Sequence, residues 1–157
     1  MASIRKVVIV RASPEDVWAA IRDLGRLPKL AAGAVAQAKM DGDMRVTVYR
    51  GAPEIREWVV DLDDIHRRLA MTATGGAILH HNSAIEVLPE GDKHARVVWV
   101  CDFLPDSLMG TIRKIMNQTV ASAKKTLEEG ARTRRPRPAK TTVKKPKPEN
   151  PRRKKRT

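Results

Sequence analysis

Hydrophobic residues follow first a strand spacing and then a helical spacing at the start of this chain. β-Branched residues dominate 3–10, which predicts a first strand. Ser13 can cap a helix, and Pro14 suits the first helical position because the N–H that proline lacks would have no partner there. Apolar residues then recur at helical spacing, at Val17, Trp18, Ile21 and Leu24. Gly25 is expected to end this helix, and a second short helix is expected over 27–32.

The apolar spacing changes to two between residues 35 and 103. Short runs of alternating residues are separated there by turn-forming glycine, proline and aspartate. The expected strands are 35–40, 44–49, 55–62, 68–73, 79–88 and 95–103. Because consecutive short strands joined by short turns pair with their neighbours, this pattern predicts an antiparallel meander.

A long helix is predicted after these strands. Asp106 and Ser107 are expected to cap it, and it is expected to end near Gly130. Its apolar stripe consists of Leu108, Ile112, Ile115, Met116, Val120, Ala123 and Leu127. A seven-stranded antiparallel sheet with one apolar face needs a cover, and only this helix is long enough to provide it. The sequence therefore predicts an α+β fold in which a curved sheet and the long helix leave space for a small apolar ligand, with the short helices at one end.

Positive charge is concentrated at the end of the chain. Residues 130–157 carry 13 of the 31 Lys and Arg side chains against one acid, Glu149, whereas residues 1–129 carry 18 basic and 17 acidic side chains. The segment holds five prolines and few apolar residues, so it cannot bury enough surface to fold alone. We therefore expect a folded domain over 1–129 and a disordered basic tail over 130–157.

The basic clusters of the tail are candidate polyanion-binding residues. They are Lys144, Lys145, Lys147, Arg152, Arg153, Lys154, Lys155 and Arg156. Their Lys, Arg and Pro composition resembles the tails of histone-H1-like and other nucleoid-associated proteins, which implies nucleic acid as a partner. An anionic membrane surface is the less favoured partner, because the chain has no lipidation signal and no amphipathic basic helix. A solubilising tail and a nuclear-import signal have the same composition, so both alternatives stay open.

Cysteine usage and hydropathy indicate the compartment. Cys101 is the single cysteine, so no intrachain disulfide can form. No segment approaches the ~20 apolar residues of a membrane span, and 1–10 lacks the apolar stretch of a signal peptide. We expect a cytoplasmic protein, associated with the nucleoid if its tail binds DNA. No metal and no cofactor are expected, because no Cys/His cluster has zinc spacing and Gly75-Gly76 lacks a dinucleotide fingerprint.

The order of elements and three segments together resemble a known superfamily. The segments are 12–18 (ASPEDVW), 57–64 (EWVVDLDD) and 98–105, which ends in Phe-Leu-Pro. They resemble the START/Bet v 1-like (SRPBCC) superfamily, and within it the polyketide cyclase/dehydrase-like proteins. The resemblance covers 4–129 and implies a helix-grip fold with a hydrophobic cavity.

The layout is also similar to that of the plant abscisic-acid receptors, in which two loops close over a ligand. The corresponding lid loops here are Gly51-Ala52-Pro53 and Gly75-Gly76. The resemblance places Glu57 at a cavity glutamate, and His81 and Ser83 where the receptors have a tyrosine and a serine. Abscisic acid itself is not expected, because the receptors' cavity lysine has no match.

The residues themselves leave the orientation of Glu57 open. Strand alternation puts Glu57 on one face and Arg56 and Trp58 on the other, and either face suits a core. Turned inward, Glu57 is a candidate acid, base or ligand anchor; turned outward, it is a solvated charge.

Four further residues are candidates for the cavity wall. His80 and His81 are neighbours on a strand and face opposite sides, so one of them is expected to face the cavity. His81 with Ser83 would offer donors or a base to a carbonyl, the alternative being a hydrogen-bonded structural histidine. Trp99 and Met116 are expected either to line the cavity or to belong to the core.

Three functions follow. The first is binding or transport of a hydrophobic small molecule, a lipid or polyketide-like compound, with the tail tethering the protein to polyanions. The second is a polyketide cyclase/aromatase-like enzyme that uses Glu57 and His81. The third is a nucleic-acid-associated regulatory or antitoxin-like protein. We favour the first, and fold alone decides no reaction.

Overall fold

The computed structural model describes residues 1–91 and 93–134, and the predictions about the remaining basic tail lie outside the described residues. The strands are β1 (Ala2–Val10), β2 (Val35–Asp41), β3 (Met44–Tyr49), β4 (Glu54–Asp63), β5 (Arg68–Thr74), β6 (His80–Pro89) and β7 (Ala95–Leu104). The helices are α1 (Pro14–Ile21), α2 (Leu27–Leu30) and α3 (Met109–Arg134), with 3₁₀ turns η1 (Leu24–Arg26) and η2 (Asp106–Leu108).

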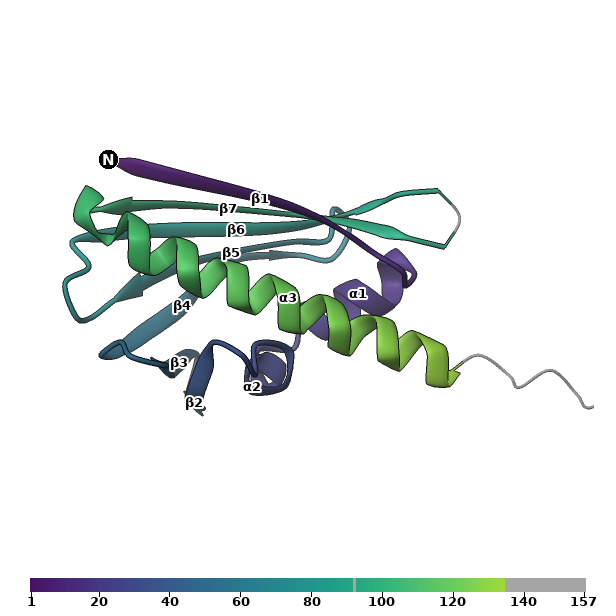
Figure 1. Ribbon diagram of the computed structural model, residues 1–157, viewed down its shortest axis with the longest axis horizontal. Coiled ribbons are helices and arrows are strands. Elements are labelled where there is room, and N and C mark those ends of the chain that lie inside the picture. Colours follow the sequence, from purple (N-terminus) through teal and green to yellow (C-terminus); the bar gives the residue numbers. More distant parts are fainter. Residues whose placement is uncertain (92, 135–157) are drawn as a thin grey trace, which may run out of the picture.

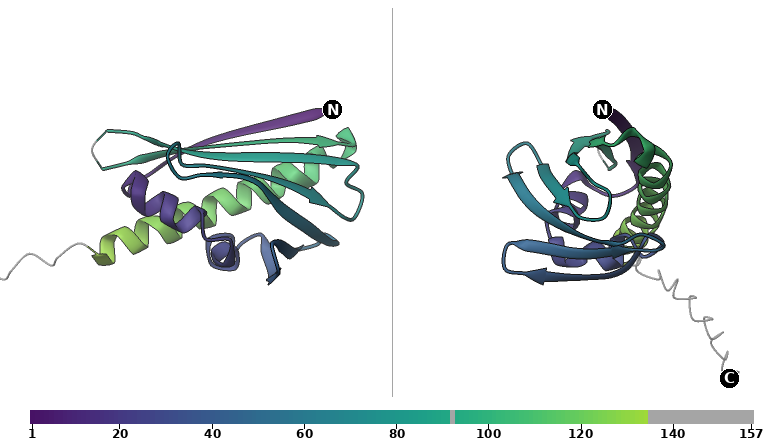
Figure 2. Two further views of the ribbon diagram at one scale, coloured as in Figure 1. Left: turned by 180° about the vertical axis from the view of Figure 1, so that it is seen from behind. Right: turned by 90° about the vertical axis from the view of Figure 1, so that its left-hand side faces the viewer.

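All seven strands form one antiparallel sheet in the order β1-β7-β6-β5-β4-β3-β2. The meander from β2 to β7 pairs each strand with the next, and β1 joins its far edge beside β7. The sheet curves around α3, which lies across its concave face (Figures 1 and 2). The predicted helix-grip α+β fold is confirmed.

The start of α1 forms as its sequence predicts. The Ser13 hydroxyl accepts a hydrogen bond from the backbone N–H of Asp16 at 3.1 Å, and Pro14 occupies the first turn. The helix ends at Ile21, however, so the prediction that it continues to Leu24 is wrong. The Asp23 carboxylate accepts from the Gly25 N–H at 3.1 Å and caps a separate 3₁₀ turn, which gives the backbone an alternative to the helix.

The start of α3 differs from the prediction. Asp106 and Ser107 do not cap it, since they lie in η2, which has no side-chain cap bond. The Asp106 carboxylate instead pairs with the N-terminal amine of Met1 at 3.1 Å. The helix also continues past Gly130 to Arg134. Its last turns are anchored by Glu128, whose carboxylate accepts three hydrogen bonds from Arg11.

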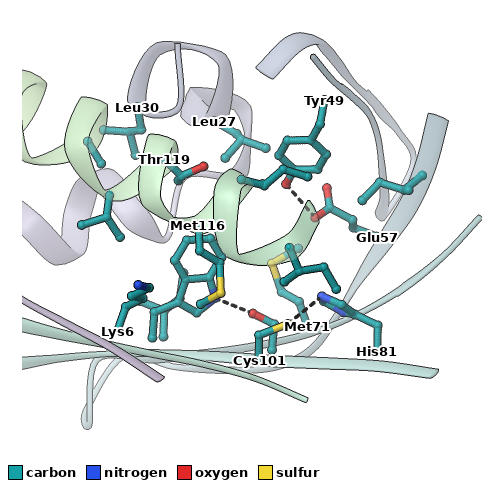
Figure 3. A pocket seen from close by; sticks show the side chains of 18 of the residues that line it. Lys6, Leu27, Leu30, Tyr49, Glu57, Met71, His81, Cys101, Met116 and Thr119 are labelled. Atoms are coloured by element: carbon teal, nitrogen blue, oxygen red, sulfur yellow. Dashed lines mark hydrogen bonds between the residues drawn. The ribbon is translucent and has the colours of Figure 1, made fainter. Parts of the chain in front are cut away.

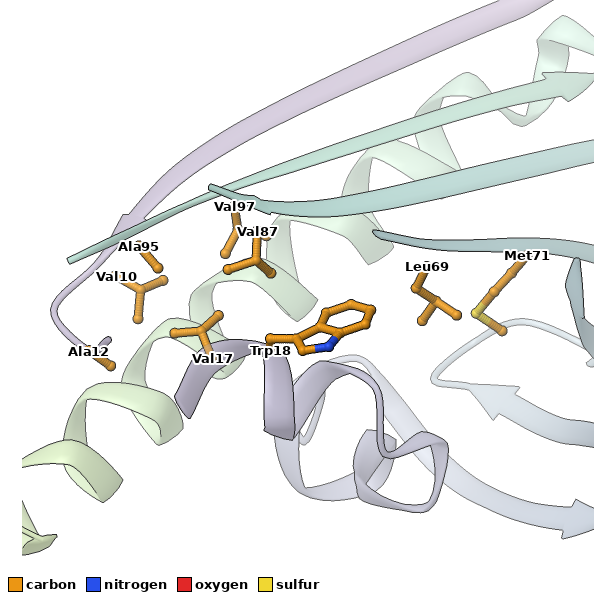
Figure 4. Close-up of a cluster of buried hydrophobic side chains, with 9 residues drawn as sticks. All are labelled: Val10, Ala12, Val17, Trp18, Leu69, Met71, Val87, Ala95 and Val97. Atoms are coloured by element: carbon orange, nitrogen blue, oxygen red, sulfur yellow. The ribbon is translucent and has the colours of Figure 1, made fainter. Parts of the chain in front are cut away.

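Three clusters of buried side chains surround the space between α3 and the sheet. The first packs α1 against the sheet and contains Val10, Ala12, Val17, Trp18, Leu69, Met71, Val87, Ala95 and Val97 (Figure 4). The Trp18 indole also donates to the Asp64 carboxylate at 2.8 Å, which ties α1 to the turn between β4 and β5. The second cluster joins β1, β7 and α3, and the third holds α2 against β2 and β3. Together they position a cavity in the middle of the fold.

Candidate ligand cavity

A cavity of about 350 Å³ lies between α3 and the concave face of the sheet (Figure 3). Its volume falls in the range of ligand pockets, about 300–1,000 Å³. Aliphatic side chains form most of the wall, among them Val8, Ile21, Leu69, Ile112 and Val120. A wall of this kind favours an apolar ligand, because binding removes apolar surface from water on both sides.

Glu57 points into the cavity, so the inward orientation is the correct one of the two. Its side chain is 9% exposed, and Trp58 stands half-buried on the opposite face. The strand register places Glu57 directly opposite Arg45 of β3 and Ala73 of β5. Both neighbours help to bury the carboxylate, and Arg45 is also its ion-pair partner.

Three polar residues of β3 hold the Glu57 carboxylate. Arg45 Nε donates to Oε2 at 2.9 Å and the Thr47 hydroxyl donates to the same oxygen at 2.6 Å. The Tyr49 hydroxyl donates to Oε1 at 3.4 Å. Burial raises the pKa of Tyr49 well above its ordinary value, and the negative charge of Glu57 acts in the same direction. The result is a buried ion pair with two further donors on its carboxylate.

Sequence reasoning missed these three partners of Glu57. Arg45, Thr47 and Tyr49 alternate with Val46 and Val48, and a rule that buries apolar residues turns the valines inward. Arg45, Thr47 and Tyr49 are all buried in the structure, as is Val46. One signal could have found them: three polar residues share one face of a strand, and the next strand carries a glutamate that needs hydrogen-bond donors if it is buried.

His81 faces the cavity and His80 is exposed, as expected for neighbours on a strand. His81 Nε2 lies 3.2 Å from the Cys101 sulfur on β7, and Nδ1 is buried with no partner among the described residues. Burial lowers the pKa of His81, an effect that the negative Glu57 opposes and His80 reinforces. Burial likewise raises the pKa of the Cys101 thiol to about 12, so Cys101 is a poor nucleophile at neutral pH.

Ser83, Trp99 and Met116 also line the cavity. The Trp99 indole donates to the Ser83 hydroxyl at 2.7 Å across β6 and β7, which fixes both side chains in the wall. Met116 is 1% exposed and packs with the second cluster, so it belongs to the core as well as to the cavity wall. Ligand binding by Glu57, His81, Ser83, Trp99 and Met116 remains a prediction.

The two candidate lid loops meet at one end of the cavity. Gly51-Ala52-Pro53 and Gly75-Gly76 all line it. A Cβ atom added to Gly76 would lie 2.6 Å from Pro53 Cγ, and one added to Gly75 would lie 2.7 Å from the Glu54 carbonyl oxygen. The φ angle is positive at both residues, 118° at Gly75 and 54° at Gly76. The close approach of the two loops therefore requires glycine at both positions. Opening and closing of these loops remains a prediction.

Within residues 1–91 and 93–134, no group of three His, Cys, Asp or Glu side chains is placed to hold a metal ion. None of the helices in the described part of the chain is long and apolar enough to cross a membrane. The candidate polyanion-binding residues from Lys144 to Arg156 lie outside the described residues.

Residues 1–134 match the model of the polyketide cyclase/dehydrase and lipid transport family, and the chain therefore belongs to this family. The expected membership in the START/Bet v 1-like superfamily is thus confirmed. No curated protein matches the chain.

Solved structures share the fold. Norcoclaurine synthase from Thalictrum flavum, in complex with dopamine and hydroxybenzaldehyde, is 17% identical with a TM-score of 0.68, covering 87% of this chain and 89% of that chain. The protein XoxI from Bacillus cereus is 20% identical with a TM-score of 0.69, covering 83% and 96%. A protein from Thermus thermophilus is 24% identical with a TM-score of 0.60, covering 84% and 98%. At these identities the likeness shows the fold and leaves the ligand open.

Proposed function

We propose that this protein binds a hydrophobic small molecule, a lipid or polyketide-like compound, in the cavity under α3, and that binding or transport rather than turnover is its activity. The observation that carries the proposal is a largely aliphatic cavity of about 350 Å³ with a polar cluster built into one wall. Apolar walls provide affinity, and a few positioned polar groups select one orientation of the ligand.

The state of the polar groups favours binding over catalysis. Both oxygens of Glu57 accept hydrogen bonds, and its charge is paired with Arg45 at 2.9 Å. Three of the roughly four acceptor positions of this carboxylate are therefore filled by β3 donors, and the position left on Oε1 can accept a hydrogen bond from a ligand. Cys101 is a thiol at neutral pH, so covalent catalysis by this residue is not favoured either.

A cyclase/dehydrase-like enzyme is the second candidate, and His81 supports it. Its ring lines the cavity, its pKa is lowered mainly by burial, and its Nδ1 has no partner among the described residues. A neutral imidazole with one uncommitted nitrogen can accept or donate a proton at an enolisable carbonyl. Turnover of such a compound that is lost in His81→Gln would establish the enzyme; a complex that binds without turnover favours the carrier.

The binding proposal is tested by filling the cavity. Ala123 lines it from α3, whereas Ala121 is exposed on the same helix. Purified full-length protein is titrated with the neutral apolar dye Nile red, and any co-purifying compound is extracted and identified by native mass spectrometry. Ala123→Trp should abolish dye binding and ligand retention, and Ala121→Trp should leave both unchanged. Dye binding that survives equally in both variants, or no binding by the wild type, would overturn the proposal.

The basic tail is proposed to tether this domain to nucleic acid, a role that rests on its charge. The test compares the full chain with a chain ending at Arg134, which keeps α3 whole. Engaging about 8 phosphates would give a log–log salt slope near −7 for duplex DNA. Loss of DNA binding in the shorter chain supports the tether, and equal binding by both chains refutes it. Binding to anionic vesicles but not to DNA would also refute it, in favour of a membrane surface.

A further inference from the structure

Lys6 is a charged residue on the inner face of a strand. Strand alternation turns Ala2, Ile4, Lys6, Val8 and Val10 of β1 toward the core, and Ile4 and Val10 are 6% and 1% exposed. Lys6 is half-buried, stands opposite Trp99 of β7 and lines the cavity. The alkyl stem of a lysine can pack along an apolar wall, whereas the ammonium group at its end attracts water or an anion.

The other charged residues of the cavity wall all have partners. Arg45 pairs with Glu57 at 2.9 Å, and Asp23 pairs with Arg26 at 3.1 Å. Lys124 donates to a backbone carbonyl at 2.6 Å and pairs with Glu128 at 3.5 Å. Lys6 has no acid or acceptor within bonding distance among the described residues. It therefore leaves one uncompensated positive charge at the cavity wall.

The middle of α3 faces this part of β1. The N-terminal amine of Met1 pairs with Asp106 just before α3, and Lys124 of α3 donates to the carbonyl of Ile9. These two bonds hold β1 along α3, so the centre of the strand lies beside the centre of the helix. Thr119 lies in that part of α3, lines the cavity, and has a buried hydroxyl with no partner among the described residues.

Lys6 and Glu57 stand on opposite sides of the cavity, and Thr119 lies on the α3 wall above Met116 (Figure 3). The cavity thus has two polar regions separated by apolar wall. The Glu57 region is already neutralised by Arg45, whereas the Lys6 region has a surplus of one positive charge. A ligand that suits both regions is apolar along its length and anionic at the end near Lys6.

We propose that Lys6 and Thr119 form an anion subsite that binds the carboxylate of an amphipathic organic acid whose apolar body fills the cavity. The inference rests on the proposed binding function and specifies its ligand class. A carboxylate fits better than a phosphate, because one ammonium balances one negative charge. Ammonium–carboxylate hydrogen bonds in a partly water-excluded site are stronger than neutral ones, so the pairing would add affinity as well as orientation.

A charge on the inner face of an edge strand can instead serve to prevent aggregation, and β1 is an edge strand. The two roles differ in what they predict. If Lys6 only prevents aggregation, replacing it changes solubility but not the relative affinity for an acid and a neutral ligand. If Lys6 is part of a subsite, replacing it changes that relative affinity.

The experiment measures binding of decanoic acid and decan-1-ol to the full chain at pH 7.5 and constant ionic strength, by displacement of Nile red. The wild type should bind the acid about tenfold tighter than the alcohol, equivalent to about 1.4 kcal/mol. Lys6→Gln should remove this preference, and Lys6→Arg should retain it. Thr119→Val should reduce the preference in part. Arg5→Gln is the matched control, because Arg5 is exposed on the outer face of the same strand.

The outcomes separate this inference from the binding function. If neither compound displaces the dye and the dye itself does not bind, the binding function fails. If both compounds bind equally to the wild type, or if Lys6→Gln and Arg5→Gln lower the preference equally, only the subsite is refuted. A preference that persists in Lys6→Gln would also refute it.

Discussion

Arg45 and Glu57 stand directly opposite each other on β3 and β4, with Arg45 Nε 2.9 Å from Glu57 Oε2 and side-chain exposures of 7% and 9%. Two buried charges in contact with a ligand cavity are a costly arrangement, since each has left water. The pair makes a wall that is polar and yet electrically neutral. It therefore provides hydrogen-bonding groups for a ligand without attracting ions.

Removing only one charge of this pair should be more damaging than neutralising both. Arg45→Met leaves the Glu57 carboxylate buried without a cation, which we expect to cost about 3–5 kcal/mol. The double change Arg45→Met with Glu57→Gln removes both charges, and the glutamine amide can accept from one of the Thr47 and Tyr49 hydroxyls and donate to the other, so it should be more stable than the single variant. Urea unfolding monitored by tryptophan fluorescence measures both. A double variant that is no more stable than Arg45→Met would contradict the expectation that the unpaired Glu57 charge causes the loss.

His81 should make stability depend on pH in a defined window. Burial lowers its pKa from the ordinary value of 6.5, so the unfolded chain binds more protons than the folded chain between 6.5 and the lower folded pKa. The contribution is complete above 6.5 and is lost as the pH falls through that window. His81→Gln should therefore flatten the fall in unfolding free energy between pH 7 and pH 5. The exposed His80→Gln variant is the control, and an unchanged slope in His81→Gln would contradict the assignment.

Glu128 should hold the junction after β1 to the end of α3. Its carboxylate accepts from the Arg11 backbone N–H at 3.0 Å and from the Arg11 guanidinium at 3.1 Å and 3.3 Å. Burial acts to raise its pKa, but the bonds from Arg11 outweigh that effect and the pKa is lowered. Its contribution is thus present above the ordinary pKa of 4.5 and is lost as the pH falls through the folded value.

Replacing Glu128 by Gln should cost about 1.5–3 kcal/mol at pH 7, because charge-assisted bonds are lost. The difference from the wild type should shrink below pH 4.5, where protonation weakens the same bonds in the wild type. The exposed neighbour change Glu129→Gln is the control. The free energy of unfolding of each protein is measured by chemical unfolding at pH 7 and below pH 4.5. A difference between the wild type and Glu128→Gln that does not depend on pH would contradict the role of the charged pair.

Gly76 should be required for the contact between the two loops at the cavity end. Gly42 and Gly76 have similar positive φ values, 59° and 54°, but a Cβ at Gly42 meets nothing within 4 Å whereas one at Gly76 meets Pro53 at 2.6 Å. Both Ala variants carry the left-handed backbone penalty, about 1–2 kcal/mol. Any further loss of unfolding free energy in Gly76→Ala, compared with Gly42→Ala, therefore measures the contact between the two loops.

Dissociation of Nile red, measured by stopped flow, should be faster in Gly76→Ala than in Gly42→Ala. The physical reason is that displacement of Pro53 opens the end of the cavity that these loops cover. Identical dissociation rates in the two variants would show that the loops do not control ligand exit.

Local patterns were sufficient for most of the fold. The Ser13–Pro14 start of α1, the alternation along the strands and the long apolar stripe of α3 are properties of neighbouring residues, and each forms as predicted. The cap of α3 could not be predicted in the same way. Asp106 is taken by the amine of Met1, a contact between residues far apart in the sequence.

The candidate site was only partly predictable. Glu57, His81 and Ser83 were placed in the cavity by the resemblance, since spacing alone left the orientation of Glu57 open, and all three line the cavity. Arg45, Thr47 and Tyr49 were missed because alternation alone does not say which face of a strand turns inward. Lys6 was missed because its charge suggests a solvent-facing position, although it shares a strand face with Ile4 and Val8.

The sequence by itself determined the order of elements, the antiparallel meander, the long covering helix and the concentration of basic residues at its end, because spacing, turn residues and charge density are properties of neighbouring residues. The tertiary structure alone decided which side chains share the cavity. Strand register placed Arg45 opposite Glu57, and the packing of α3 over β1 brought Thr119 to the same cavity as Lys6. Long-range contacts of this kind decide whether a charged residue in the cavity wall has a partner. The free energy of a buried charge depends on that partner, so the residues next to it in the sequence do not determine it.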